Sequence, residues 1–425
     1  MTLARRPVPE GPPVEPVPGR GGRRFGPVAY AGPAALVAVG YIDPGNWGTD
    51  ITAGAMFGHR LLWVLVVANV VALFLQYLAA RLGLVTGADL AELLGRRLSG
   101  VPRALVVAVV AVVLVATEVA EFLGVVLALR LLLGIPMALA IALGAVLVIG
   151  TLTVAAGNRA VQRCIIWLLA VVAGVYVFEL WLSRPGGQVA SGLVPTLPPD
   201  AAPVAIAMLG ATVMPHNLFL HSRVVRWPLE QDPGGAAAKS VLRRTVIASA
   251  VALNVALLIN AAILVVAADT HEQRQGGGPV PATLAEAAES LTPALGPLAT
   301  GAFGLGLLAA GLASTTTSGV TGQFVIEGLT GLRPPLLARR AAALVPAALL
   351  LFLGVGEVRA LMLSQLVLSL ALPVVIYVLI RLTTDRTLMG PHTGRPVTRY
   401  AAYGVLALVV VADLVALADL VRSPI

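Results

Sequence analysis

Long apolar stretches separated by short polar segments run along almost the whole chain. Each stretch can supply the roughly 20 apolar residues that a helix needs to cross the hydrocarbon core of a bilayer. Most of the charged residues lie in the segments between them. The pattern predicts an all-α membrane protein with eleven transmembrane helices, at 28–57, 61–82, 102–132, 137–156, 162–183, 202–224, 241–267, 297–327, 339–356, 359–381 and 400–421.

Two of these spans are interrupted in the middle by proline and polar residues. The first contains Asp43–Asn46, with the sequence DPGN, and the sixth contains Met214–Asn217, with the sequence MPHN. A carboxylate at mid-membrane costs about 2.5 to 3.5 kcal/mol on insertion scales, and proline removes a backbone donor. Freed backbone groups are tolerated at that depth only where they face protein or a water-filled cavity. We therefore interpret both segments as helices broken at a site, and not as turns outside the bilayer.

The two breaks occupy corresponding positions in two sets of five spans, residues 28–183 and 202–381. Because five is odd, the second set enters the membrane with the opposite orientation. Such a pair of interrupted helices is typical of inverted-repeat transporters that bind their substrate at the midplane. Residues 400–425 are then an additional eleventh helix. Residues 1–27 are rich in Pro, Gly and Arg and are expected to form a disordered cytoplasmic tail, not a signal peptide.

Composition and charge narrow the class of protein further. Hydrophobic residues make up 58% and charged residues 12% of the chain, which excludes a soluble globular domain. With the N-terminus inside, 23 of the 29 Lys and Arg residues lie in or beside cytoplasmic segments, as the positive-inside rule predicts. The net charge of +8 therefore indicates a multi-pass cell-membrane protein with a cytoplasmic N-terminus and an outside C-terminus, and not a nucleic-acid partner.

Two further classes of protein are excluded by residues that the chain lacks. The one cysteine, Cys164, excludes an intrachain disulfide framework and a cysteine-based metal cage. No GxxxxGK[ST] motif is present, so transport driven by ATP hydrolysis within this chain is not expected.

The two breaks offer a mixed set of metal donors. These are the Asp43 carboxylate, the Asn46 amide oxygen, the Met214 thioether and a backbone carbonyl freed near Ala211. Hard cations such as Mg2+ prefer oxygen-only sites, whereas a thioether favours softer transition metals. The set predicts Mn2+ or Fe2+ as the substrate, with Cd2+ as a toxic passenger. The alternative for Met214 is a gap-filling core methionine, but its place directly before Pro215 favours a ligand.

The same motifs resemble those of a known family. Asp43–Asn46 and residues 210–217 (GATVMPHN), extended through Leu218–Ser222, are similar to the signatures of the Nramp (natural resistance-associated macrophage protein) family. Its members are proton-coupled divalent metal transporters with a leucine-transporter-like 5+5 inverted repeat. The resemblance covers nearly all of the chain beyond the tail. It implies the same metal ligands and places Gln365 of the tenth span near the metal when the outer vestibule closes. The alternative for Gln365 is an interhelical hydrogen bond, worth about 0.6 kcal/mol.

Two glutamates in the third span suggest a proton path. Glu118 and Glu121 are three residues apart and share one helix face, and carboxylates within an apolar span are by default a proton-relay hypothesis. Arg339 and Arg340 open the ninth span and are placed to pair with them on the cytoplasmic side. The alternative is that both glutamates are static ion-pair partners of the arginines.

Histidine 216, in the sixth-span break, is of a type that titrates near neutral pH. The resemblance implies that His216, the glutamates and the arginines form a proton-exit route, with Asp43 as the proton acceptor. The alternative for His216 is a hydrogen-bonded core histidine that only shapes the cavity.

The chain departs from the family pattern at two positions. Leu312 stands where the family usually has a glutamine, and Glu118 stands where it usually has an aspartate. The hydroxyl run Ser314–Ser318 either bonds back to its own helix or lines a pore. Asn254 and Asn260 have no role that the sequence reveals.

The sequence therefore predicts a secondary transporter that imports Mn2+ or Fe2+ with protons by alternating access. It is not expected to be an enzyme or to need a cofactor or an obligate protein partner. One alternative is a Mg2+ or other hard-cation carrier of the same fold, in which Met214 is incidental. A second is a sodium-coupled amino acid symporter, which Asp43 disfavours because an acid repels the substrate carboxylate. A third is a membrane sensor that transports nothing.

Overall fold

The computed structural model describes residues 28–155, 159–183, 187–226, 238–273, 286 and 297–422, and this part of the chain is almost entirely helical. The elements in chain order are α1 (Val28–Val39), α2 (Pro44–Phe57), η1 (Gly58–Leu61), α3 (Leu62–Thr86), α4 (Leu90–Arg97), α5 (Gly100–Leu133), α6 (Met137–Ala155), α7 (Arg159–Ser183), η2 (Gly187–Leu193), α8 (Ala202–Thr212), α9 (Pro215–Val224), α11 (Ala238–Gln273), α13 (Pro297–Thr330), α14 (Leu336–Phe352), α15 (Glu357–Thr383), α16 (Arg386–Met389), η3 (Gly390–His392) and α17 (Pro396–Arg422).

Every predicted apolar span corresponds to a helix or to a pair of helices. The first span is α1 with α2, the sixth is α8 with α9, and the others are α3, α5, α6, α7, α11, α13, α14, α15 and α17. Within the described residues, seven helical stretches are long and apolar enough to cross a membrane, and 137–151 and 167–182 form shorter apolar helices. The short helices α4 and α16 were not predicted. The N-terminal tail lies outside the described residues.

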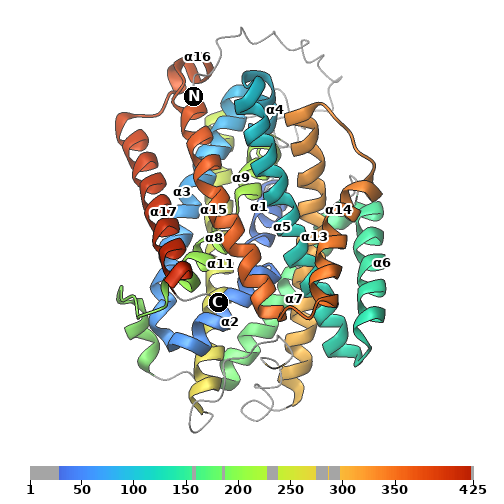
Figure 1. Ribbon diagram of the computed structural model, residues 1–425. Helices are drawn as coiled ribbons and strands as arrows, with labels where there is room; N and C mark the ends of the chain where they lie inside the picture. The colour runs from blue at the N-terminus through green and yellow to red at the C-terminus, as the bar shows by residue number, and fades with distance from the viewer. Residues whose placement is uncertain are drawn as a thin grey trace.

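The long helices run side by side from one end of the molecule to the other, and α4 and α16 lie together at one end (Figure 1). The central helices α2, α5, α8, α11, α13 and α15 pack against one another. Helix α17 packs on α15 and α8, but only 22% of its apolar window is buried. Its exposed apolar side chains, and those of α5, α11 and α14, have the composition of a lipid-facing surface.

Both breaks have the same local cause. Pro44 and Pro215 each occupy the first position of the new helix, where a missing N–H costs nothing. Each proline lies four residues after a carbonyl, that of Gly40 or Ala211, and so cannot donate the helical hydrogen bond to it. The chain therefore leaves the helix before each proline and starts a new one, which confirms the prediction of interrupted first and sixth spans.

Candidate metal and proton site

The first break buries Asp43 and Asn46, which are 1% and 0% exposed. Asp43 caps α2, because its Oδ1 accepts from the Asn46 backbone N–H at 3.0 Å and from Asn46 Nδ2 at 2.7 Å. The remaining oxygens, Asp43 Oδ2 and Asn46 Oδ1, are buried and have no hydrogen-bond partner. The cap thus fixes the two side chains and leaves one acceptor of each unused.

The second break lies directly beside the first. A Cβ placed on Gly40 would come within 2.1 Å of Asn217 Nδ2, so the start of α9 touches the start of the first break, directly after α1. Ala211 and Met214 are fully buried, at 0% and 1% exposure. The Ala211 carbonyl has no N–H four residues further on, because that residue is Pro215. Because α2 also packs against α8, the two breaks lie next to each other in a buried part of the molecule.

Gln365 of α15 contacts both interrupted helices. A Cβ on Gly45 would lie 2.0 Å from Gln365 Nε2 and 3.0 Å from Asp43 Oδ2. The backbone carbonyl of Gln365 also approaches Gly210 of α8, and would lie 2.5 Å from a Cβ placed there. The Gln365 amide donates to Ser364 Oγ at 3.0 Å, but its Oε1 has no partner. Gln365 is thus a third buried oxygen acceptor left open beside Asp43.

Three oxygen acceptors from α2, its cap and α15 thus lie near one another without a donor. Buried polar atoms in proteins are almost always hydrogen-bonded, so such a set needs a partner from outside the chain. Among the described residues, no group of three or more His, Cys, Asp or Glu is arranged to hold a metal ion. A cation at this place would therefore be held by one carboxylate together with amide, carbonyl and thioether donors.

The glutamates of α5 have two different environments. Glu121 accepts from Ser318 Oγ at 2.5 Å and is 1% exposed. Glu118 pairs with Arg340 Nη1 at 3.2 Å, and Arg340 Nη2 also donates to the Thr315 carbonyl at 2.8 Å. Glu118 is therefore in an ion pair with Arg340, whereas Glu121 is hydrogen-bonded to the Ser318 hydroxyl.

Arg339 does not hydrogen-bond to either glutamate; its Nη1 donates to the Gly319 carbonyl at 3.0 Å. His216 lies at the start of α9, and its Nδ1 is 3.2 Å from Thr117 Oγ1 of α5. Thr117 is adjacent to Glu118 in sequence. The ring thus connects the second break to the helix that carries the glutamates.

Most of the hydroxyl run in α13 bonds back to its own helix. Ser314 donates to the Gly311 carbonyl, Thr315 and Thr316 donate to the Leu312 carbonyl, and Thr317 donates to the Ala313 carbonyl. Only Ser318 also donates to another helix, at Glu121. The run therefore contributes one hydroxyl to the carboxyl cluster.

Sequence reasoning missed a polar chain behind the first break. Gln76 Nε2 donates to the Tyr41 hydroxyl at 2.8 Å, and Gln76 Oε1 lies 2.8 Å from His221 Nδ1. The Tyr41 carbonyl accepts from Asn260 Nδ2 at 2.8 Å, which gives Asn260 a structural role at the break. The sequence shows these polar residues within apolar spans, but it does not show which of them pair across helices.

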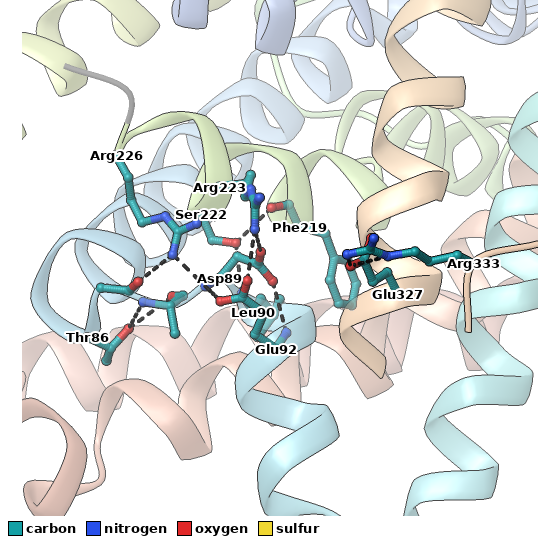
Figure 2. Close-up of polar contacts among 12 residues, drawn as sticks. Thr86, Asp89, Leu90, Glu92, Phe219, Ser222, Arg223, Arg226, Glu327 and Arg333 are labelled. Carbon is teal, nitrogen blue, oxygen red and sulfur yellow. Dashed lines mark hydrogen bonds and ion pairs between the residues drawn. The ribbon is translucent and has the colours of Figure 1, made fainter. Parts of the chain in front are cut away.

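The short helix α4 joins the end of α9 through an ion-pair network. Arg223 Nη1 donates to Asp89 Oδ2 at 3.0 Å and to Glu92 Oε1 at 2.8 Å, and Arg226 lies 3.6 Å from Glu92 Oε2. Figure 2 shows both arginines reaching from the end of α9 towards the start of α4. Asp89 and Glu92 also form a capping box for α4. The network holds α4 against the end of α9.

A second ion pair at the same end ties α4 to the segment after α15. Arg97 Nη1 donates to Asp385 Oδ2 at 2.8 Å. Burial alone raises the pKa of Asp385, but hydrogen bonds from Thr387 and the charge of Arg97 outweigh it and leave that pKa below its ordinary value. Asp385 therefore stays charged at neutral pH.

At the opposite end of the molecule, two ion pairs link the ends of other helices. His59 Nε2 lies 3.0 Å from Asp269 Oδ1, which joins η1 to α11. Arg130 Nη1 lies 3.0 Å from Glu357 Oε1, which joins α5 to α15. The buried donors at the two breaks thus lie between ion pairs at both ends of the molecule.

Comparisons with known proteins agree with this arrangement. The model of the natural resistance-associated macrophage protein-like family (Nramp) matches residues 34–419. The divalent metal cation transporter MntH of Aeromonas hydrophila is 37% identical over 386 residues, 89% of this chain and 93% of the relative. MntH of Ralstonia nicotianae is 40% identical over 406 residues, 91% of this chain and 89% of the relative.

Solved structures are similar in fold as well. A crystal structure of a variant of the Eremococcus coleocola manganese transporter superposes with a TM-score of 0.79 at 30% identity, covering 92% of this chain and 86% of that one. Mhp1, a nucleobase-cation-symport-1 family transporter, has a TM-score of 0.59 at 16% identity over 93% and 90% of the two chains, a likeness of fold alone. These similarities confirm the predicted fold class.

Proposed function

The chain belongs to the Nramp family, and we propose that it imports divalent transition-metal ions together with protons by alternating access. The observation that carries the proposal is the set of three buried oxygens, Asp43 Oδ2, Asn46 Oδ1 and Gln365 Oε1, which lack a partner beside the two breaks. A desolvated cation supplies the positive charge that these acceptors require. The metal is cargo, and no cofactor takes part.

The donor set favours Mn2+ or Fe2+ over hard cations. We assign Asp43, Asn46, the Ala211 carbonyl, Met214 and Gln365 as ligands, because the sulfur of Met214 adds a soft donor to four oxygens. The relatives named as divalent metal cation and manganese transporters support the same choice. One carboxylate and no thiolate give a modest affinity, so the ion can leave on the other side.

The proton path that we propose starts at Asp43, which loses its proton when a cation arrives. His216 connects the second break to α5 through Thr117, and Glu121 of α5 is held by Ser318 of α13. The second part of the path is Glu118, which pairs with Arg340. The adjacent Arg339 donates to the Gly319 carbonyl. Arg340 is 2% exposed, so protonation of Glu118 changes the net charge of a buried pair.

We propose that the end of the molecule with α4 and α16 faces the cytoplasm. That end carries Arg97, Arg223, Arg226, Arg386 and Arg395, and positively charged loops stay inside. The N-terminus is then cytoplasmic and the C-terminus is outside. Uptake therefore runs from the end of the His59–Asp269 pair towards the end of the Arg223 network.

Uptake by proteoliposomes tests the function. With an acidic outside solution, Mn2+ entry should accelerate and should bring protons into the lumen, while excess Ca2+ or Mg2+ should compete weakly. Met214→Ala should reduce the preference for Mn2+ over Ca2+ by about tenfold, equivalent to about 1.4 kcal/mol. Met56→Ala is the matched control, because Met56 lies on α2 but is 47% exposed.

One second candidate has an observation in its favour. The three unpartnered atoms are all oxygens, which is the donor type that Mg2+ prefers. If Met214→Ala leaves the order of competing ions unchanged, the chain is a hard-cation carrier and the assignment of Met214 is wrong. If no divalent ion enters liposomes under any gradient, transport itself is refuted.

A further inference from the structure

One buried acid lies on helix α17, outside the site described above. Asp413 is the one charged residue between Arg399 and Asp419 of that helix, and it is 5% exposed. Its Oδ1 accepts a hydrogen bond from Ser369 Oγ of α15 at 2.7 Å, and its Oδ2 is buried without a partner among the described residues. An acid within a membrane span costs more free energy than one interhelical hydrogen bond returns. Helix packing alone therefore does not account for Asp413, and acids at such positions mark functional sites.

Apolar contacts hold α17 against two helices of the proposed metal site. Helix α17 packs on both α15 and α8. Ala416 lies three residues after Asp413, on the same face of α17. It belongs to one buried cluster with Ile206 of α8 and Leu366 of α15. Since small residues let helices approach closely, Asp413 reaches Ser369 at a place where α17, α15 and α8 meet.

Ser369 lies one helical turn after Gln365, the α15 residue of the proposed metal site. In an α-helix the N–H of residue 369 donates to the carbonyl of residue 365. A Cβ placed on Gly210 of α8 would lie 2.8 Å from Ser369 Cβ and 2.9 Å from Ser369 N. The turn 365–369 thus contacts α8 through its backbone and α17 through the Ser369 hydroxyl.

The side chain of Gln365 has little freedom to adapt if this turn moves. It is 0% exposed, and its Nε2 donates to Ser364 Oγ at 3.0 Å. A Cβ placed on Gly45 of α2 would collide with the same Nε2, so the amide is enclosed by α2. The position of Gln365 Oε1, which has no partner, therefore depends on where the turn lies. A binding group must be held to within about 0.5 Å of its working geometry.

We propose that Asp413 is a positioning residue for metal binding, which holds Ser369 and so fixes the turn of α15 that presents Gln365 to the cation. The proposal rests on Gln365 being a ligand, as in the proposed function. Asp413 acts through Ser369 and not by contact with the ion. A hydrogen bond to a carboxylate is about twice as strong as one between neutral groups, so an acid holds the hydroxyl more firmly than an amide would. The eleventh helix, an addition to the two predicted repeats, thereby becomes part of the transport machinery.

Mn2+ binding to purified variants tests this role. Ser369→Ala and Asp413→Leu both remove the hydrogen bond and should each raise the Kd for Mn2+ about tenfold, as the loss of groups that orient metal ligands does. Asp413→Asn keeps an oxygen acceptor and should raise the Kd by less than about threefold. Asp419→Asn is the matched control, because Asp419 is a half-buried acid nearer the end of the same helix, and its Kd should equal that of the unmodified protein.

Uptake by proteoliposomes gives a second readout. In Ser369→Ala the KM for Mn2+ should rise with the Kd, while the rate at saturating Mn2+ stays within about twofold, because the change removes binding that is made before the ion moves.

A double-mutant cycle with Gln365 separates positioning from general support of the fold. Gln365→Ala should itself weaken Mn2+ binding. Adding Ser369→Ala to it should then change the Kd by less than about twofold, because the ligand that Ser369 positions is already absent. A residue that only stabilises helix packing would instead lower the unfolding temperature and weaken binding by the same factor with and without Gln365.

The outcomes separate this proposal from the proposed function. If the unmodified protein binds no Mn2+, or if Gln365→Ala binds it as tightly, the proposed function or its ligand set is wrong, and the role of Asp413 falls with it. If Gln365→Ala weakens binding and Ser369→Ala does not, only the positioning role is wrong. Equal effects of Ser369→Ala with and without Gln365 also overturn it. Ser369→Ala, which removes one hydroxyl, decides the matter if Asp413→Leu does not fold.

Discussion

At the scale of single residues, the account depends on buried atoms that the protein leaves without partners. Asp43 uses one oxygen to cap α2 and keeps the other open, so that one side chain both begins the helix and offers a ligand. The DPGN pattern made this predictable, because a mid-membrane acid beside proline has few structural roles. The position of Gln365 beside Gly45 was not predictable in the same way, since it depends on how α15 packs against α2.

Asp50 of α2 and Glu179 of α7 also show what the sequence could not predict. Both were visible in the sequence as acids within apolar stretches. Only the structure shows that both are fully buried and that the rings of Trp47 and Tyr176 connect their helices.

A glycine on α2 gives a prediction at this scale. A Cβ on Gly54 would lie 2.3 Å from the backbone carbonyl of Leu264 in α11 and 2.9 Å from the Ala267 Cβ. Backbone cannot move aside as a flexible side chain can, so Gly54→Ala should destabilise the protein by about 1 to 3 kcal/mol. Thermal unfolding in detergent, together with Mn2+ uptake, measures the effect.

The control for this substitution is Gly404→Ala on α17, where no atom lies within 4 Å of the added Cβ. An unfolding temperature that is lowered equally by both changes, or by neither, would show that α2 and α11 are not packed as closely as described.

At the scale of elements, ion pairs join the short helix α4 to the interrupted helix α9. Helix α4 packs on α13 and reaches α9 through Arg223. The eleven apolar spans were predictable from hydropathy, because each is long enough to dominate its region of sequence. Helix α4 has eight residues and an amphipathic composition, so its pattern was not distinguishable from that of a polar connection.

We predict that the Arg223 network holds α4 and α9 together at the cytoplasmic end. In Arg223→Ala, Asp89 would lose a partner while it remains 0% exposed, which leaves a buried acid uncompensated. The amides of 89–97 should then exchange with deuterium at least several-fold faster, because local opening becomes easier.

Arg333→Ala is the matched control, since Arg333 pairs with Glu327 at the same end of the molecule but is largely exposed (Figure 2). Exposed pairs contribute about 0 to 1 kcal/mol. Equal exchange of 89–97 in the two variants would contradict a holding role for Arg223.

At the scale of the whole molecule, charge and apolar surface together describe a protein oriented in a bilayer. The distribution of Lys and Arg was readable from the sequence, and it remains the basis for the proposed orientation. The two five-helix repeats also remain a prediction, although the matching proline breaks in α1–α2 and α8–α9 have the form that such repeats require.

The orientation is testable in intact cells. An epitope fused after Ile425 should be cleaved by an external protease, and one fused before Met1 should be protected until the membrane is opened. Cleavage of the N-terminal epitope in sealed cells would reverse the direction of transport proposed above.

The central claim is that the two broken helices bring the Asp43 carboxylate and the Met214 sulfur to one ion. X-ray absorption spectroscopy of the purified protein with bound Cd2+ tests this most directly, because sulfur and oxygen neighbours scatter differently. We predict one sulfur neighbour in the unmodified protein and in Met56→Ala, and oxygen or nitrogen neighbours alone in Met214→Ala. A metal shell without sulfur in the unmodified protein, or a sulfur signal that survives Met214→Ala, would contradict the account.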